Sequence, residues 1–145
     1  MALIFDAKVA LFGRLQASVP AGVQCTFAET GDNSRRKQVW LGSTTDDDLV
    51  SAAMRAGAKP TNITGYVEVH AVVITPGKPM DAERAVYEIR DGVKDACLAL
   101  NGDLPSVPGL LDVRAESATV ETIETTDGAY SALTLRVRVR GRVYQ

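Results

Sequence analysis

The chain has 145 residues, of which 46% are hydrophobic and 23% charged, as is usual for a folded domain with a hydrophobic core. Its 16 basic and 18 acidic side chains leave a net charge of −2. This balance argues against a dedicated nucleic-acid-binding protein, in which Lys and Arg are in excess. The sequence has no apolar run of membrane-span length and no basic segment of a signal peptide at its start, so we expect a soluble protein made in the cytoplasm.

The first part of the chain predicts a helix followed by a strand. Apolar residues recur at three- and four-residue steps from about Phe5 to Ser18, and the helix breakers Pro20 and Gly22 follow. The next segment, VQCTFA (23–28), alternates apolar and polar residues and therefore predicts a strand.

A second strand is predicted in KQVWLGS (37–43), which contains Trp40, the only tryptophan. A polar segment from Glu29 to Lys37 separates the two strands, so we expect a hairpin with a long charged tip. We interpret Trp40 as an anchor in the core or at the sheet edge rather than as a residue that stacks on a ligand. A place in a subunit interface is the main alternative, because indole rings often anchor such contacts.

The segment TTDDDLVSAAMRAG (44–57) holds three consecutive acids, Asp46, Asp47 and Asp48. These carboxylates could cap a short helix, because acids favour its positive N-terminal end. A loop is an equal alternative. Consecutive aspartates point in different directions, so the segment lacks the spacing of a calcium-binding loop and is interpreted as a solvated acidic patch.

The middle of the chain predicts a long strand and a long helix. The strand GYVEVHAVVIT (65–75) places alternate residues on one face: Val67, Val69, Ala71 and Val73. The helix runs from about Met80 to Leu100 after Pro79. Its apolar positions fall three and four apart and form one stripe that faces the core: Ala82, Val86, Ile89, Val93, Ala96, Cys97 and Leu100.

The C-terminal part predicts two long strands joined at Asp127-Gly128, a hairpin signal. The second strand contains LRVRVRGRV (135–143), in which Arg136, Arg138, Arg140 and Arg142 alternate with small or apolar residues. That turn would place Arg136 opposite Thr119 and Arg138 opposite Ser117. The arginines would then form one polar face and be mostly free to bind carboxylates of a partner. Residues 1–145 are thus predicted to form a single α+β domain, whose mainly antiparallel sheet is packed by an N-terminal helix and one long helix.

Catalytic chemistry finds little support in the sequence. The only histidine, His70, lies within a predicted strand without a neighbouring nucleophile, and neither GxSxG nor the phosphate-binding GxxxxGK[ST] motif occurs. Cys25 and Cys97 are far apart, so we expect buried free thiols rather than a metal site, with a disulfide as the alternative. We therefore expect no enzymatic activity, no cofactor and no metal.

The order of elements, from FDAKVALFGRL (5–15) through QVWLGS and GYVEVHAVVI to the C-terminal hairpin, resembles that of the tail terminator, or head–tail completion, proteins of long-tailed bacteriophages. The resemblance covers nearly the whole chain. It implies a structural protein without catalytic residues that forms a ring, expected to be a hexamer. Such a ring caps the head-proximal end of the tail tube, stops its polymerisation and contacts the head connector.

The resemblance also implies partners and a location. The partners would be further copies of the chain, the major tail tube protein and the head–tail connector protein, with DNA only as passing cargo and no membrane. The location would be the tail–head junction of the virion. A ring suits the segregated charges, because the acids Asp46 to Asp48 on one copy could meet the arginine strand of the next. The alternatives are another ring-forming neck or tail-tube subunit, or a small nucleic-acid-binding domain that uses Arg136 to Arg142.

Overall fold

The computed structural model describes residues 2–30, 36–46 and 61–143. Its elements are, in chain order, α1 (Leu3–Ser18), β1 (Gln24–Thr26), β2 (Lys37–Asp46), β3 (Thr61–Thr75), α3 (Pro79–Asn101), the short 3-10 helix η1 (Leu104–Ser106), β4 (Leu110–Thr125) and β5 (Gly128–Val143).

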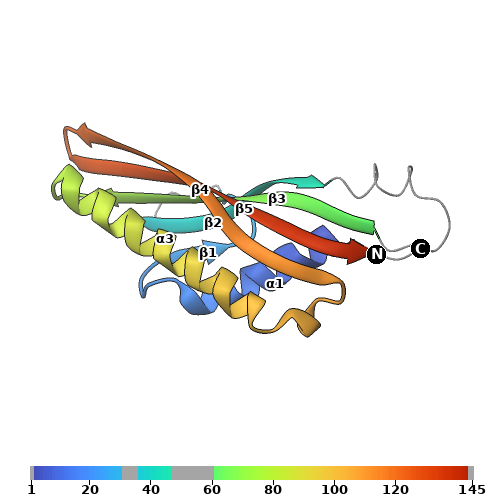
Figure 1. Ribbon diagram of the computed structural model, residues 1–145. Helices are drawn as coiled ribbons and strands as arrows, with labels where there is room; N and C mark the ends of the chain where they lie inside the picture. Colours follow the sequence, from blue (N-terminus) through green and yellow to red (C-terminus); the bar gives the residue numbers. More distant parts are fainter. Residues whose placement is uncertain (1, 31–35, 47–60, 144–145) are drawn as a thin grey trace.

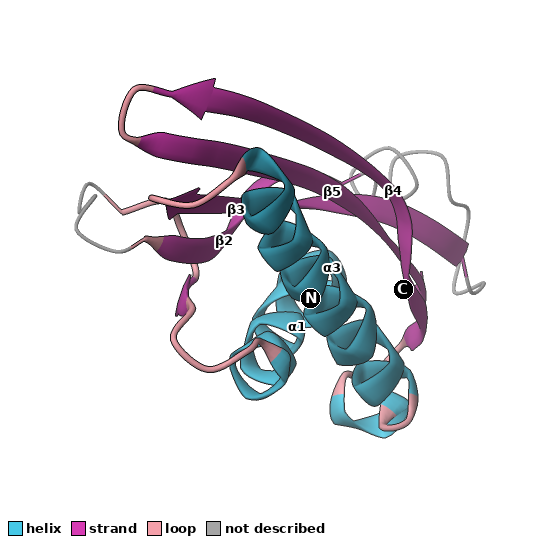
Figure 2. Ribbon diagram, turned by 90° about the vertical axis from the view of Figure 1, so that its left-hand side faces the viewer, coloured by secondary structure: helices cyan, strands magenta, loops and turns pink. Residues whose placement is uncertain are grey.

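The strands form one sheet with the order β1-β2-β3-β5-β4. β1 pairs in parallel with β2, and all other neighbours are antiparallel. Both helices lie on the same face of this sheet (Figures 1 and 2). Among the described residues, no helix covers the opposite face, which we call the open face. The predicted α+β class, with a mainly antiparallel sheet packed by an N-terminal and a long helix, is confirmed.

The core forms where the apolar faces of the sheet and the two helices meet. The predicted apolar stripe of α3 is buried at every position, and so are the inward residues of β3. Leu135, Val137 and Val139 of β5 face the same core. The two periodicities, 2 for strands and 3.6 for helices, therefore predicted the core residues of these elements correctly.

The predicted hairpin of the first two strands is wrong. β1 and β2 are parallel, with Cys25 opposite Val39 and Thr26 opposite Trp40. Residues 27–36 connect them, and a stretch of this length can return the chain to the starting end of the first strand. The alternation in residues 23–28 predicted a strand but carried no information on its direction. β1 is also shorter than predicted.

The C-terminal hairpin exists, but its predicted register is wrong. Thr125 pairs with Gly128, so the two-residue turn is Thr126-Asp127, and β4 has an irregularity between Ala115 and Ser117 that inserts one extra residue. Arg136 consequently faces Ser117 rather than Thr119, and Arg138 faces Arg114 rather than Ser117. The inward and outward faces of β5 are nevertheless those predicted from its alternation.

The acidic segment is described only at its start. Thr44, Thr45 and Asp46 belong to β2. The alternative of helix or loop concerned residues 44–57 and is wrong for these first three residues, which are in a strand; residues 47–57, including Asp47 and Asp48, lie outside the described residues.

Gly128 is required by close packing rather than by the turn. Its φ is +145°, and a Cβ there would collide with the backbone oxygen of Thr75 and lie 2.7 Å from the Cα of Pro76. We expect Gly128→Ala to destabilise the protein by about 1–3 kcal/mol, because backbone atoms cannot move aside as a side chain can. Thermal or urea unfolding would measure this change.

Gly13→Ala is the matched control. Gly13 lies within α1, and a Cβ there would meet no atom within 4 Å. Alanine should therefore stabilise the protein by about 0.5–1 kcal/mol, because glycine loses more backbone entropy in a helix. Equal effects of the two substitutions would contradict the packing argument.

Candidate functional site: the arginine face of the sheet

The arginines of β5 lie on the open face, between β3 and β4. Their positions alternate with the buried Leu135, Val137 and Val139, and both neighbouring strands contribute side chains to the same face. Arg136, Arg138 and Arg140 therefore each have one cross-strand neighbour on β3 and one on β4, and Arg142 has one on β3. These neighbours decide which guanidinium groups remain available to a partner.

Arg140 forms an ion pair within the chain. It faces Asp112 on β4, and its Nε donates to Oδ1 of Asp112 at 3.0 Å while its second nitrogen donates to Oδ2. These hydrogen bonds hold the pKa of the Asp112 carboxyl below its usual range, and the nearby charges of Arg138 and Arg114 act in the same direction. The pairing also raises the pKa of Arg140. Such a two-point contact fixes the guanidinium in place.

Arg142 and Arg136 also have partners in the chain. The Nε of Arg142 donates to Oδ1 of Asn62 at 3.1 Å. The guanidinium of Arg136 lies 3.6 Å from the ring centre of Tyr66, a cation–π contact. Three of the four arginines predicted to be free are thus engaged by neighbours on β3 or β4, which sequence alone could not identify without the register.

Arg138 is different, because its neighbour on β4 is Arg114. Directly opposite residues of antiparallel strands have Cβ atoms about 4.5–5.5 Å apart, so two positive charges share a small area. Neither guanidinium forms an ion pair with the described residues, and the Nε of Arg138 is buried without a hydrogen-bond partner. Like charges at such positions are destabilising unless an anion joins them. We call Arg114 and Arg138 the arginine pair.

Trp40 and His70 form a second cluster on the open face. Their rings stack with centres 5.8 Å apart and planes inclined by 24°. The Nε2 of His70 lies 3.1 Å from Oε2 of Glu68, and its Nδ1 lies 3.4 Å from the hydroxyl oxygen of Thr134. The histidine thus contacts an aromatic ring on β2, a hydroxyl on β5 and a carboxylate on its own strand. These contacts orient it as a residue of the sheet surface.

The cluster adjoins a hollow that is lined by Trp40, His70, Val72, Tyr130 and Thr134 among others. Its wall combines aromatic rings with small and polar side chains. The sequence favoured an anchor in the core or at the sheet edge for Trp40, with ligand stacking or a subunit interface as alternatives; the side chain lies half-buried on the open face of β2. The half-exposed position beside this hollow is compatible with both, and the predicted interface role stays a prediction.

Asp46 and the arginines of β5 lie on different strands of the sheet. Asp46 ends β2, opposite Gly65 of β3, and its side chain is exposed. β3 separates β2 from β5. The predicted contact of Asp46, Asp47 and Asp48 with arginines of a neighbouring copy stays a prediction. Asp47 and Asp48 are not described.

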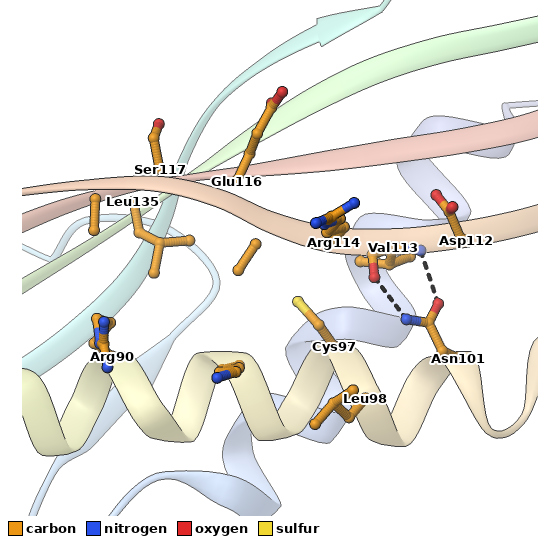
Figure 3. A pocket seen from close by; sticks show the side chains of 13 residues that line it. Arg90, Cys97, Leu98, Asn101, Asp112, Val113, Arg114, Glu116, Ser117 and Leu135 are labelled. Atoms are coloured by element: carbon orange, nitrogen blue, oxygen red, sulfur yellow. Dashed lines mark hydrogen bonds between the residues drawn. The ribbon is translucent and has the colours of Figure 1, made fainter.

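A groove between α3 and β4 was not predicted from the sequence (Figure 3). At one end, Asn101 bridges the two elements: its amide donates to the carbonyl of Val113 at 2.7 Å, and its oxygen accepts from the N–H of Val113 at 2.8 Å. In sequence, Asn101-Gly102 appears only as a helix terminator. The signal that could have indicated the groove is the polar side chain that ends the apolar stripe of α3.

Both cysteines are free; Cys97 is buried, as predicted, whereas Cys25 is only half-buried. Burial raises the pKa of Cys25 to about 11 and that of Cys97 to about 12, so both remain neutral thiols at physiological pH. Within the described ranges, no group of three or more His, Cys, Asp or Glu side chains is arranged to hold a metal ion. The helices of these ranges are also too short or too polar to cross a membrane.

Asp112 should link stability to pH. Its carboxyl has a lower pKa in the folded protein than in the unfolded chain, so the unfolded chain binds a proton more readily. The stabilisation is present above the ordinary carboxyl pKa of about 3.9 and is lost as the pH falls through the lower, folded value. We expect Asp112→Asn to make the unfolding midpoint less sensitive to acidification between about pH 5 and pH 3. The control Glu116→Gln removes one exposed carboxylate from the same strand and should retain the wild-type sensitivity.

The fold was compared with those of known proteins, and similar chains were found among the solved structures. No protein-family model and no curated protein matches the sequence. A chain in the solved structure described as "Virion of native gene transfer agent (GTA) particle" has a similar fold, with a TM-score of 0.56 and 18% sequence identity. The alignment covers 92% of this chain and 94% of that chain. At this identity the likeness establishes the fold, and it extends over nearly the whole length of both chains.

Proposed function

We propose that the chain is a structural subunit of a phage-like particle, and specifically a tail terminator. In this role it forms a ring, expected to be a hexamer, at the head-proximal end of the tail tube. Two observations support the proposal: the order of elements resembles that of tail terminators, and a chain of a gene transfer agent virion has the same fold over nearly its full length.

The ring would end polymerisation of the tail tube and join it to the head. Its partners would be the major tail tube protein on one side and the head–tail connector protein on the other, with DNA passing through as cargo. The protein would therefore be located at the tail–head junction of the virion. We propose no reaction for it.

The arginine pair is the observation that carries the assembly role. Arg114 and Arg138 lie opposite each other, without an ion pair to the described residues, on a sheet face that no described helix covers. A carboxylate from another molecule would relieve their repulsion and could accept hydrogen bonds from both. The arginine strand was predicted to be an interface as a whole. Three of its arginines contact side chains of the same chain: Arg136, Arg140 and Arg142. We therefore restrict the proposed interface to Arg138 with Arg114.

The sheet order favours a head-to-tail contact. β4, with Arg114, is one edge of the sheet, whereas β2, with Asp46, lies near the other edge. When unlike surfaces of identical subunits meet, the assembly closes into a ring if the rotation between copies permits it. The acidic segment that begins at Asp46 is our proposed source of carboxylates for the arginine pair of the next copy.

Reversing the charge of the arginine pair tests this proposal. We expect wild-type protein to form rings in negative-stain images and a corresponding mass in light scattering. Arg114→Glu with Arg138→Glu should abolish the rings, because the acidic partner would then be repelled. The protein should remain folded, because the substitutions exchange one like-charge contact on the open face for another of opposite sign.

Arg84→Glu is the matched control. Arg84 is an exposed residue of α3, on the covered side of the sheet, and forms only a 3.7 Å contact with Asp81. Its reversal should leave rings intact. Rings that persist in the double variant would refute the proposed interface. A steep salt-dependent affinity of the wild-type protein for duplex DNA would favour the alternative nucleic-acid-binding role.

A further inference from the structure

β4 is an edge strand, and α3 covers only the first part of its free edge. The side chain of Asn101 forms hydrogen bonds with both the N–H and the C=O of Val113, as the backbone of a neighbouring strand would. One turn earlier in the helix, Cys97 interacts with the backbone of Ala115, whose N–H partly offsets the effect of burial on the thiol pKa. Side chains of α3 thus replace a strand partner at two successive positions that point away from β5.

These contacts with the backbone lie before the bulge of β4, and beyond it the hydroxyl of Thr122 donates to Oε1 of Glu83 on α3 at 2.8 Å. Beyond Ser117 the strand continues to Thr125, with no further strand beside it in the described sheet. Unpaired N–H and C=O groups along an edge are a template for another strand. Proteins usually block such edges, and here Asn101 and Cys97, which block the first part of the edge, belong to the lining of the groove (Figure 3).

The groove has an apolar floor and a volume of about 540 Å³. Cys97, Ala118 and Leu135 contribute to its lining, and the exposed side chain of Leu98 lies at its rim (Figure 3). Side chains of a strand alternate in direction, so a strand added to β4 would direct every second residue toward this floor. Small or branched apolar residues at those positions would fit the hollow.

The groove is also electropositive. Arg90 and Lys94 of α3 and Arg114 of β4 line it. The two acids of the same lining, Asp112 and Glu116, are turned away from α3 in Figure 3, and Asp112 is engaged by Arg140. Arg90 contacts Asp91 at 2.9 Å, yet its Nε is buried without a hydrogen-bond partner, and Lys94 forms no ion pair with the described residues.

We propose that this groove binds an extended acidic segment of a partner protein, which adds to β4 as a sixth strand beyond the bulge. The backbone of β4 would supply hydrogen bonds, the apolar floor would accept alternate side chains, and Arg90 and Lys94 would bind acidic residues between them. This site lies on the helix side of the sheet edge, whereas the proposed ring contact lies on the open face, and Arg114 borders both.

The test uses the full-length protein and an acetylated, amidated peptide of four Glu-Val repeats. We expect titration of the peptide, followed by ¹H–¹⁵N NMR, to shift the amide signals of residues 117–121 and to slow their hydrogen exchange. A peptide with Lys in place of Glu should not bind. Peptide in which alternate backbone nitrogens are methylated should lose binding, because strand addition needs those donors.

Variants separate the electrostatic part of the proposal. Lys94→Glu should weaken binding of the Glu-Val peptide by about fivefold or more, since it exchanges an attraction for a repulsion. Arg84→Glu, on the same helix outside the groove lining, should leave the affinity unchanged. Absence of amide shifts at millimolar peptide, equal binding of the Lys peptide, or insensitivity to Lys94→Glu would each overturn the proposal. Negative-stain images of Lys94→Glu, taken in parallel, would show whether the ring contact at the arginine pair still forms.

Discussion

The alternation of β5 is the constraint on which the rest of the structure depends. This strand lies between β3 and β4, so its inward residues must be apolar and its outward residues must fit between two neighbouring strands. Leu135, Val137 and Val139 meet the helices, and the arginines between them face away. Because both helices pack on one side, the polar face stays open, and the fold itself creates a surface of cross-strand polar contacts.

These contacts differ in a way that separates stability from association. The bond of Arg140 to Asp112 and the stacking of Arg136 on Tyr66 satisfy charges within the chain. Arg138 lies opposite Arg114, so two positive charges face each other. A surface adapted only for the stability of a single copy would favour an acid at one of these positions. The proposed assembly role explains the unfavourable pair, because a carboxylate of a neighbouring subunit would offset the repulsion between the two arginines.

The sequence was sufficient for the elements and their faces, because those depend on local periodicity. The apolar stripe of α3 and the inward residues of β3 and β5 were predicted correctly for this reason. Partners were not predictable to the same degree. The bulge between Ala115 and Ser117 and the turn at Thr126 change which residues face each other while leaving the faces unchanged. Only the register therefore identified three further residues of the site: Asp112, Arg114 and Tyr66. The sequence of β1 contains no local signal of its parallel pairing.

Arg114 connects the two proposed surfaces. It faces Arg138 across the strands, and it also belongs to the lining of the groove between α3 and β4. An acidic residue bound in the groove near Arg114 would neutralise part of the arginine pair from the other side of the strand. The arginine pair would then attract a carboxylate on the open face less strongly, because its net positive charge would be smaller. If both surfaces act as proposed, binding of the extended segment and association of subunits are therefore coupled, and substitution of Arg114 alone should affect both, whereas substitution of Lys94 should affect only the groove.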